Sequence, residues 1–229
     1  MFGYFNLFPY FCIINQLQTN RIMETKKYKI RKDISCVFKG HTLYRIQALK
    51  KNVSVRKGDL GGWIEKEENL SQEGTCWVFD NAKVFGNAEV SGNAVIKDKA
   101  QVYGCAKINQ SACIIQYAQV YGTAIISFYA HVRKHAKVYD NALVDDYAMI
   151  DDYAHVSGNA HVYGEGEVCM KAHVYGNAEI YDEGTIHGEV EVYGNAKVYD
   201  EGFIRDKAKV YGDAKVYGNT FIHGNDILC

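Results

Sequence analysis

A six-residue period runs through most of this chain and limits what it can fold into. From Val78 to Ile222, every sixth residue is Val or Ile, which makes 25 consecutive positions without an insertion. A second register lies two residues earlier, from Ala82 to Thr220, and 19 of its 24 residues are Ala. An α-helix or a heptad repeat does not have a period of six. Internal repeats this short and regular indicate a solenoid.

The repeat unit reads Ala-x-Val-Tyr-Gly-Asn, which predicts one short strand and one corner. Because side chains alternate between the two faces of a strand, Ala and Val point inward, while Tyr and the residue between Ala and Val point outward. β-Branched residues favour strands, and Gly and Asn accept the left-handed backbone of a tight bend. Such units stack as a parallel β-helix in which each coil covers its neighbour.

This pattern resembles that of the hexapeptide-repeat proteins, whose motif is aliphatic-x-x-x-small-x and whose fold is a left-handed parallel β-helix shaped as a triangular prism. The resemblance covers about residues 74–229. The stretch Lys57–Ala82 also resembles the entry cap of bacterial and phage members, many of them labelled transferases. The resemblance to hexapeptide-repeat proteins implies coils of about 18 residues, and therefore about eight coils. We predict an all-β, single-stranded left-handed parallel β-helix with a small N-terminal β-rich cap.

Charge and composition suggest three segments. Residues 1–22 begin with an apolar, aromatic run that is too short to span a bilayer and lacks the features of a secretory signal. Because Met23 begins the segment METKKYKI, which resembles a natural translation start, we interpret 1–22 as a tail or a mis-annotated extension. Residues 23–73 form the predicted cap, and 74–229 the β-helix. Residues 23–66 carry a net charge of +8, and residues 67–229 one of −10.

The basic cap allows three interpretations. It attracts a polyanion such as nucleic acid, it binds the acidic body of another copy, or it is a solvated surface with no ionic partner. The seven cysteines form no CxxC pair and are typical of free thiols in a reducing compartment. The chain has no apolar run of membrane length, so we predict a cytoplasmic protein without a membrane partner.

Folding the sequence at 18 residues per coil places outward side chains in rows. Stacked rings and amides reinforce parallel strands; alternatively, such a row is a surface for a sugar, a planar ligand or a protein. One row, which we call the tyrosine ladder, consists of Phe85, Tyr103, Tyr121, Tyr139, Ser157, Tyr175, Tyr193 and Tyr211. A second tyrosine row contains Tyr163, Tyr181, Tyr199 and Tyr217, and a corner row contains Asn141, Asn159, Asn177, Asn195 and Asp213. The candidate binding residues are Tyr139, Ser157, Tyr175, Tyr193 and Tyr211.

The tyrosine ladder has one gap at Ser157, between Tyr139 and Tyr175, which we call the notch. His155 lies beside it, and His173 follows one coil later in the same row. Paired imidazoles titrate near neutral pH and can serve as a general base, a proton shuttle or half a metal site. His155 and His173 are therefore the candidate catalytic residues; alternatively, they are ordinary outward-facing side chains. No third histidine completes a zinc site with them, so we predict no metal.

Four further clusters are candidates for packing or weak ion binding. They are the pairs Asp145-Asp146 and Asp151-Asp152, an acidic corner of Glu165, Glu183 and Glu201 with Asp182 and Asp200, the column Tyr117, His135 and Tyr153, and the row His187, Arg205 and His223. Carboxylates of the acidic corner could bind Ca²⁺, although a solvated edge is the simpler interpretation.

Two function classes follow. Many hexapeptide-repeat proteins are trimeric acyltransferases that use coenzyme A, and others are zinc-dependent carbonic anhydrases. Here no loop leaves the repeat between residues 78 and 222. We therefore predict a non-catalytic binding or scaffold protein, without a cofactor, that acts through the tyrosine ladder and binds a protein partner or self-associates end to end. The alternative is an acyltransferase that uses acetyl-coenzyme A, with His155 or His173 as general base. Nucleic-acid binding through residues 23–66 is a weaker prediction, because no recognition module is evident.

Overall fold

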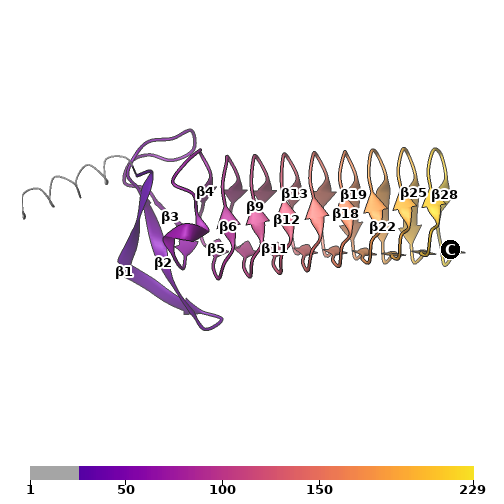
Figure 1. Ribbon diagram of the computed structural model, residues 1–229, viewed down its shortest axis with the longest axis horizontal. Coiled ribbons are helices and arrows are strands. Elements are labelled where there is room, and N and C mark those ends of the chain that lie inside the picture. Colours follow the sequence, from indigo (N-terminus) through magenta and orange to yellow (C-terminus); the bar gives the residue numbers. More distant parts are fainter. Residues whose placement is uncertain (1–25) are drawn as a thin grey trace, which may run out of the picture.

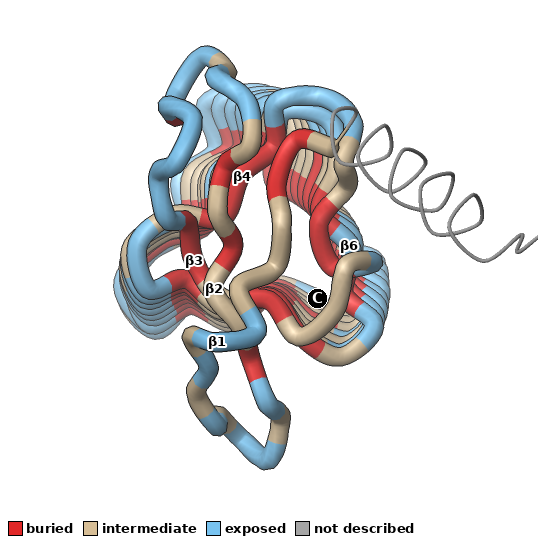
Figure 2. The backbone as a smooth tube through the Cα atoms, turned by 90° about the vertical axis from the view of Figure 1, so that its left-hand side faces the viewer, coloured by how far each residue is buried: buried red, intermediate tan, exposed pale blue. Residues whose placement is uncertain are grey.

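The structure, a computed structural model, describes residues 26–229; the predicted tail at residues 1–22 lies outside the described residues. The described chain is a long parallel β-solenoid with a small group of strands at its N-terminal end (Figure 1). In the view along the solenoid axis, buried residues line the inside of the coils and exposed residues lie on the outside (Figure 2). This confirms the predicted all-β parallel β-helix.

The N-terminal end is a hairpin that continues into the solenoid. Strands β1 (Tyr28–Phe38) and β2 (His41–Ala48) pair antiparallel. Strand β3 (Leu60–Ile64) pairs antiparallel with β2 and parallel with β5, and the short 3-10 helix η1 (Glu67–Asn69) follows. The cap and the solenoid therefore share one 12-stranded sheet.

Three sheets form the sides of the solenoid, and each strand pairs in parallel with the strand one coil later. Side A contains, after β3, β5 (Lys83–Val84), β8 (Gln101–Val102), β11 (Gln119–Val120), β14 (Lys137–Val138), β17 (His155–Val156), β20 (His173–Val174), β23 (Glu191–Val192), β26 (Lys209–Val210) and β29 (Ile227–Leu228). Side B contains β6 (Glu89–Val90), β9 (Lys107–Ile108), β12 (Ile125–Ile126), β15 (Leu143–Val144), β18 (His161–Val162), β21 (Glu179–Ile180), β24 (Lys197–Val198) and β27 (Lys215–Val216). Side C contains β4 (Trp77–Val78), β7 (Val95–Ile96), β10 (Cys113–Ile114), β13 (His131–Val132), β16 (Met149–Ile150), β19 (Glu167–Met170), β22 (Thr185–Gly188), β25 (Phe203–Asp206) and β28 (Phe221–Ile222).

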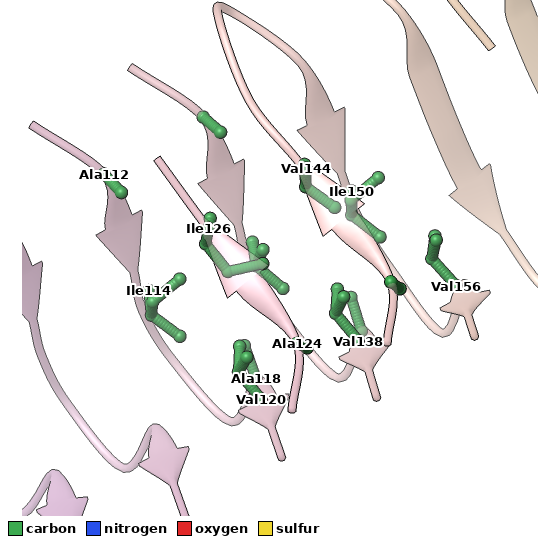
Figure 3. Packing of buried hydrophobic residues seen from close by; sticks show 14 of the residues in the cluster. Ala112, Ile114, Ala118, Val120, Ala124, Ile126, Val138, Val144, Ile150 and Val156 are labelled. Carbon is green, nitrogen blue, oxygen red and sulfur yellow. The ribbon is translucent and has the colours of Figure 1, made fainter. Parts of the chain in front are cut away.

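The core is the six-residue register predicted from the sequence. From Val78 to Val216, every Val or Ile of that register is at most 1% exposed. The alanines between them fill the space near the corners (Figure 3). Burying one such aliphatic side chain contributes roughly 1.5–3 kcal/mol before entropy is counted.

The first coil departs from the register. Ile64 pairs with Val84, and Leu70 forms a bridge with Val90, so both are 20 residues from their partners instead of 18. Both side chains are fully buried. A strict count of hexads starts at Val78 and therefore misses this coil.

The corners hold their shape through small residues and an amide ladder. Gly194 has a φ of +74°, and an added Cβ would lie 2.9 Å from the Gly212 nitrogen in the next coil. The predicted asparagine row is confirmed, because each side-chain amide donates to the next side-chain oxygen at 3.1 Å from Asn141 to Asn195. Asn195 then donates to Asp213 at 2.9 Å.

Candidate functional site

The tyrosine ladder is a stack of parallel rings along side A. Neighbouring rings have centroids 4.8 to 5.0 Å apart and planes within 10° of each other, on both sides of the notch. Burial raises the pKa of Tyr121 to about 12, with smaller contributions from neighbouring hydroxyls and Asp140. Because each ring covers the faces of its neighbours, the stack presents ring edges and hydroxyl groups to solvent. A flat aromatic surface exists only where the stacking stops.

The first ring of the ladder is covered by the tip of the β1–β2 hairpin. Phe38 meets Phe85 edge to face at 5.9 Å, and His41 lies 5.0 Å from the same ring. The Lys39 ammonium lies 4.3 Å from the centroid of Tyr103. At the N-terminal end of the ladder, no ring face is therefore left open.

At the notch the stack is interrupted and a hollow opens. Ser157 is only 6% exposed because neighbouring side chains cover it, and its short side chain interrupts the row of rings between Tyr139 and Tyr175. The hollow has a volume of about 460 Å³. It is lined by Asp140, Ser157, Gly158, His173, Tyr175, Gly176 and Glu191.

Both candidate histidines lie beside this hollow. His155 and His173 are register partners in β17 and β20, and their rings meet edge to face at 5.2 Å. A hydrogen bond of 3.3 Å joins the Tyr139 hydroxyl to Nε2 of His173. Tyr139 also contacts the edge of His155 at 6.1 Å. The structure thus brings together His155, His173, Tyr139, Ser157 and Tyr175.

Three of the candidate binding residues, Tyr139, Tyr193 and Tyr211, do not line the hollow. Tyr193 stacks on Tyr175, and Tyr211 stacks on Tyr193. Tyr193 and Tyr211 therefore continue the stack on the side of Tyr175 that faces away from the notch. Asp140 and Glu191, by contrast, line the hollow although the sequence analysis gave them no role. The signal that places Asp140 there is its 18-residue spacing from Gly158, whose N–H donates to its carboxylate at 3.3 Å.

Burial keeps both imidazoles neutral near pH 7. Desolvation lowers the pKa of His155, and the nearby charges of His173 and Lys137 lower it further. Desolvation also lowers the pKa of His173, while Glu191 acts in the opposite direction. A neutral imidazole has an unprotonated nitrogen and can accept a proton. The notch therefore holds two candidate bases in their active form.

These pKa shifts predict a pH-dependent stability. Because the pKa of each histidine is lower in the folded protein than the usual value of about 6.5, protons bind more readily to the unfolded chain. Their destabilising effect is absent above about pH 6.5 and grows as pH falls through the folded pKa values. We expect urea denaturation to show a loss of unfolding free energy below about pH 6.5, and a smaller loss in His155→Gln/His173→Gln. An identical pH profile in that double variant would contradict the assignment.

Lys83 and Lys137 on side A, and Lys39 in the turn of the β1–β2 hairpin, have no carboxylate partner among residues 26–229. Lys137 is the register partner of His155, one coil before it. Burial lowers the pKa of Lys39, and the charge of Lys137 lowers it further, so the two ammonium groups act on each other. Lys83 of the same side lies over the Phe38 ring at 4.8 Å. This surface favours an anionic group next to the notch.

Several basic residues of the cap have internal partners. Lys27 is 7% exposed and donates to the Glu73 and Cys76 carbonyl oxygens. Lys26 pairs with Glu67, and Arg31 pairs with Asp33. Part of the +8 charge at residues 23–66 therefore supports the cap itself. Nucleic-acid binding through this segment stays a prediction.

The remaining clusters have packing partners or lie apart from the hollow. Tyr117, His135 and Tyr153 form the predicted stack, with centroids 4.8 Å apart. Asp151 binds Arg133 and Lys134. Across the described part of the chain, the structure holds no group of three or more His, Cys, Asp or Glu arranged to bind a metal. Residues 26–229 also contain no helix of the length and apolarity that crossing a membrane requires.

The repeat and the coil length match the pattern of hexapeptide-repeat proteins. The chain has their six-residue register and their 18-residue coils. No protein-family profile matches it. A segment is 40% identical over 60 residues to the uncharacterized acetyltransferase YdcK of Escherichia coli, a match that covers 20% of this chain and 18% of that relative. The chain thus spans less than a fifth of that relative's length.

Proposed function

We propose that this protein is an acyltransferase that moves an acyl group from acyl-coenzyme A to a hydroxyl or amine, with the notch as its active site. The observation that carries the proposal is the hollow at Ser157, where a neutral imidazole, His173, faces space for an acceptor. A pocket with convergent polar groups and shifted pKa values is the usual form of an active site. Similarity to a protein named an acetyltransferase supports the reaction class.

His173 is the base in this proposal, because it lines the hollow and Tyr139 orients its ring. When Nε2–H donates to the Tyr139 oxygen, Nδ1 keeps the free electron pair. The acceptor O–H or N–H gives its proton to Nδ1 as its oxygen or nitrogen bonds to the thioester carbonyl carbon. The C–S bond breaks, and the proton passes from the imidazole to the leaving thiolate. His155 lies at the edge of His173, where its neutral ring avoids repulsion when His173 becomes charged.

The donor's phosphates have suitable partners on side A. Lys137 and Lys39 lie on the cap side of the notch, and neither forms an ion pair within residues 26–229. Phosphate groups attract unpaired lysines, and that attraction weakens as salt rises. We therefore place the phosphates along this strip and the thioester at the notch.

The test is transfer measured as release of free thiol from acetyl-coenzyme A in the presence of primary amines and alcohols, together with calorimetric binding of acetyl-coenzyme A. His173→Gln should lower kcat by roughly 10²–10⁴, the usual contribution of a general base, and leave donor binding intact. The matched control is His131→Gln, on side C, which should behave like the parent. An absence of both binding and thiol release at millimolar acetyl-coenzyme A would refute the proposal.

A binding role without catalysis is the second candidate, favoured by exposed aromatic rings at a different corner. Tyr129 and Tyr147 stack at 5.2 Å and are 52% and 62% exposed, with Phe128 beside them. Exposed aromatic residues are enriched in protein interfaces. Light scattering should then show a mass that rises with concentration in the parent and stays monomeric in Tyr129→Ser/Tyr147→Ser. A parent that is monomeric at every concentration would remove self-association from this candidate.

A further inference from the structure

The notch is the place in the tyrosine ladder where two ring faces lack a stacked tyrosine. Tyr139 stacks on Tyr121 at 4.9 Å, and Tyr175 stacks on Tyr193 at 4.8 Å. On the other side of each ring, the position that a tyrosine fills in neighbouring coils belongs to Ser157. The two imidazoles beside the gap lie at steep angles to these rings, 81° for His155 on Tyr139 and 52° for His173 on Tyr175. Neither imidazole replaces the missing parallel ring.

The dimensions of the gap suit one aromatic ring. Each ring of the ladder advances by 4.8 to 5.0 Å, and the coils on both sides of Ser157 keep the same hydrogen-bonded register. The backbone N–H of Ser157 bonds to Val174 at 3.0 Å, as that of Tyr139 bonds to Val156. The scaffold is therefore undistorted at the gap, and the hollow of about 460 Å³ is open to a guest. A planar ring that enters it stacks as the ladder's own tyrosines do.

The polar rim of the hollow selects the chemistry of the guest. Asp140 and Glu191 contribute carboxylates, which accept hydrogen bonds and do not donate them when ionised. One Asp140 oxygen accepts from Gly158, and one Glu191 oxygen accepts from Lys209 at 3.1 Å. An ionised carboxylate has about four acceptor sites, so both side chains can accept a further donor. Their oxygens favour N–H donors on the guest and repel carbonyl oxygens.

We infer that the notch binds a planar heteroaromatic ring carrying an amino group, which stacks on Tyr175 and donates to the carboxylates of the rim. The claim that this ring belongs to the acyl acceptor rests on the proposed function. The claim that the notch binds such a ring does not. The ring anchors the acceptor, and the group that receives the acyl lies next to His173.

The probes are adenosine and purine riboside, which share a purine and a ribose and differ only in the 6-amino group that adenosine carries. Calorimetry without acetyl-coenzyme A should show saturable binding of adenosine and at least tenfold weaker binding of purine riboside, with no binding of ribose. Equal affinities for the two nucleosides would overturn the selection for an amino group. No saturable binding of either would overturn the ring site.

Two tyrosine variants separate the wall of the notch from the rest of the ladder. Tyr175→Leu removes the open ring face and should weaken adenosine binding about tenfold, within the range that loss of a stacking partner produces. Tyr193→Leu removes the next ring, which has tyrosines on both sides, and should change the affinity less than twofold. Circular dichroism melting checks that both variants fold. Equal effects of the two substitutions would contradict the inference.

Failure of this inference and failure of the proposed function give different results. If adenosine binds and no acceptor promotes thiol release, the ring site stands and acyl transfer is refuted. If simple amines are acylated in a His173-dependent way and adenosine does not bind, acyl transfer stands and the ring site is refuted.

Discussion

Removal of one whole coil, residues 91–108, should leave a folded β-helix, whereas deletion of Gln101 alone should destabilise the protein severely. The coil deletion joins Val90 to Asn109, which occupies the position that Ser91 held, so every inward residue stays inward. Sides A, B and C lose one strand each, and the tyrosine ladder closes from Phe85 to Tyr121. Because coils contact mainly their neighbours, the remaining coils keep their interfaces.

The single-residue deletion acts through the twofold alternation of the strand. Without Gln101, Val102 takes an outward position and Tyr103 an inward one, in a core that is filled by Val, Ile and Ala. Exposing one buried Val costs roughly 1.5–3 kcal/mol, and forcing a large side chain into a packed core costs about 1–3 kcal/mol more. Every later coil meets the same conflict unless the chain restores the phase at a shortened corner.

Thermal melting and urea denaturation of the two variants test this ranking. The protein that lacks 18 residues should retain a cooperative transition close to that of the parent, and the protein that lacks one should lose several kcal/mol, about 3 or more. A six-residue deletion, residues 97–102, is the matched control, because it preserves the inward phase and misaligns only the outward rows. It should fall between the other two. A Gln101 deletion as stable as the parent would contradict the account.

The same periodicity explains what the sequence predicts well. A buried row that repeats every six residues specifies inside and outside at each position, and the 18-residue coil specifies which residues stack. The asparagine row and the stacking of Tyr121 on Tyr139 follow from this arithmetic. So does the convergence of His155, Ser157 and His173.

The six-residue period does not predict features that depend on the non-periodic segments. Ile64 and Leu70 enter the core with a different spacing, and the hairpin tip covers Phe85 through tertiary contacts between distant segments. The tilt that brings the Tyr139 hydroxyl to His173, two coils away, is a matter of ring packing and leaves no mark in the sequence. The 18-residue spacing also could not show that stacked rings cover each other's faces, so that the ladder presents ring edges to solvent and is interrupted at the notch.

Ser157→Tyr should raise the stability of the protein and abolish the activity of the notch at the same time. The new ring has the backbone position of its ladder neighbours and gains two stacking contacts, with Tyr139 and Tyr175. Aromatic pairs contribute about 0.5–1.5 kcal/mol each, so the unfolding free energy should rise by roughly 1–3 kcal/mol. The same ring occupies the hollow that adenosine and the acceptor need, so binding and thiol release should both disappear.

The matched control is Ser127→Tyr on side B. Ser127 is 8% exposed, close to the 6% of Ser157, but its row neighbours one coil away are Asn109 and Asp145. A tyrosine there has no rings to stack on, so stability should not increase, and adenosine binding and thiol release should match those of the parent. A Ser157→Tyr protein that is no more stable than the parent would mean that the gap does not accept a ring. If it is more stable and still releases thiol at the parent's rate, the reaction takes place elsewhere. Ser157 interrupts an otherwise regular row of rings. If this interruption is the functional site, a substitution that restores the row should raise stability and remove activity.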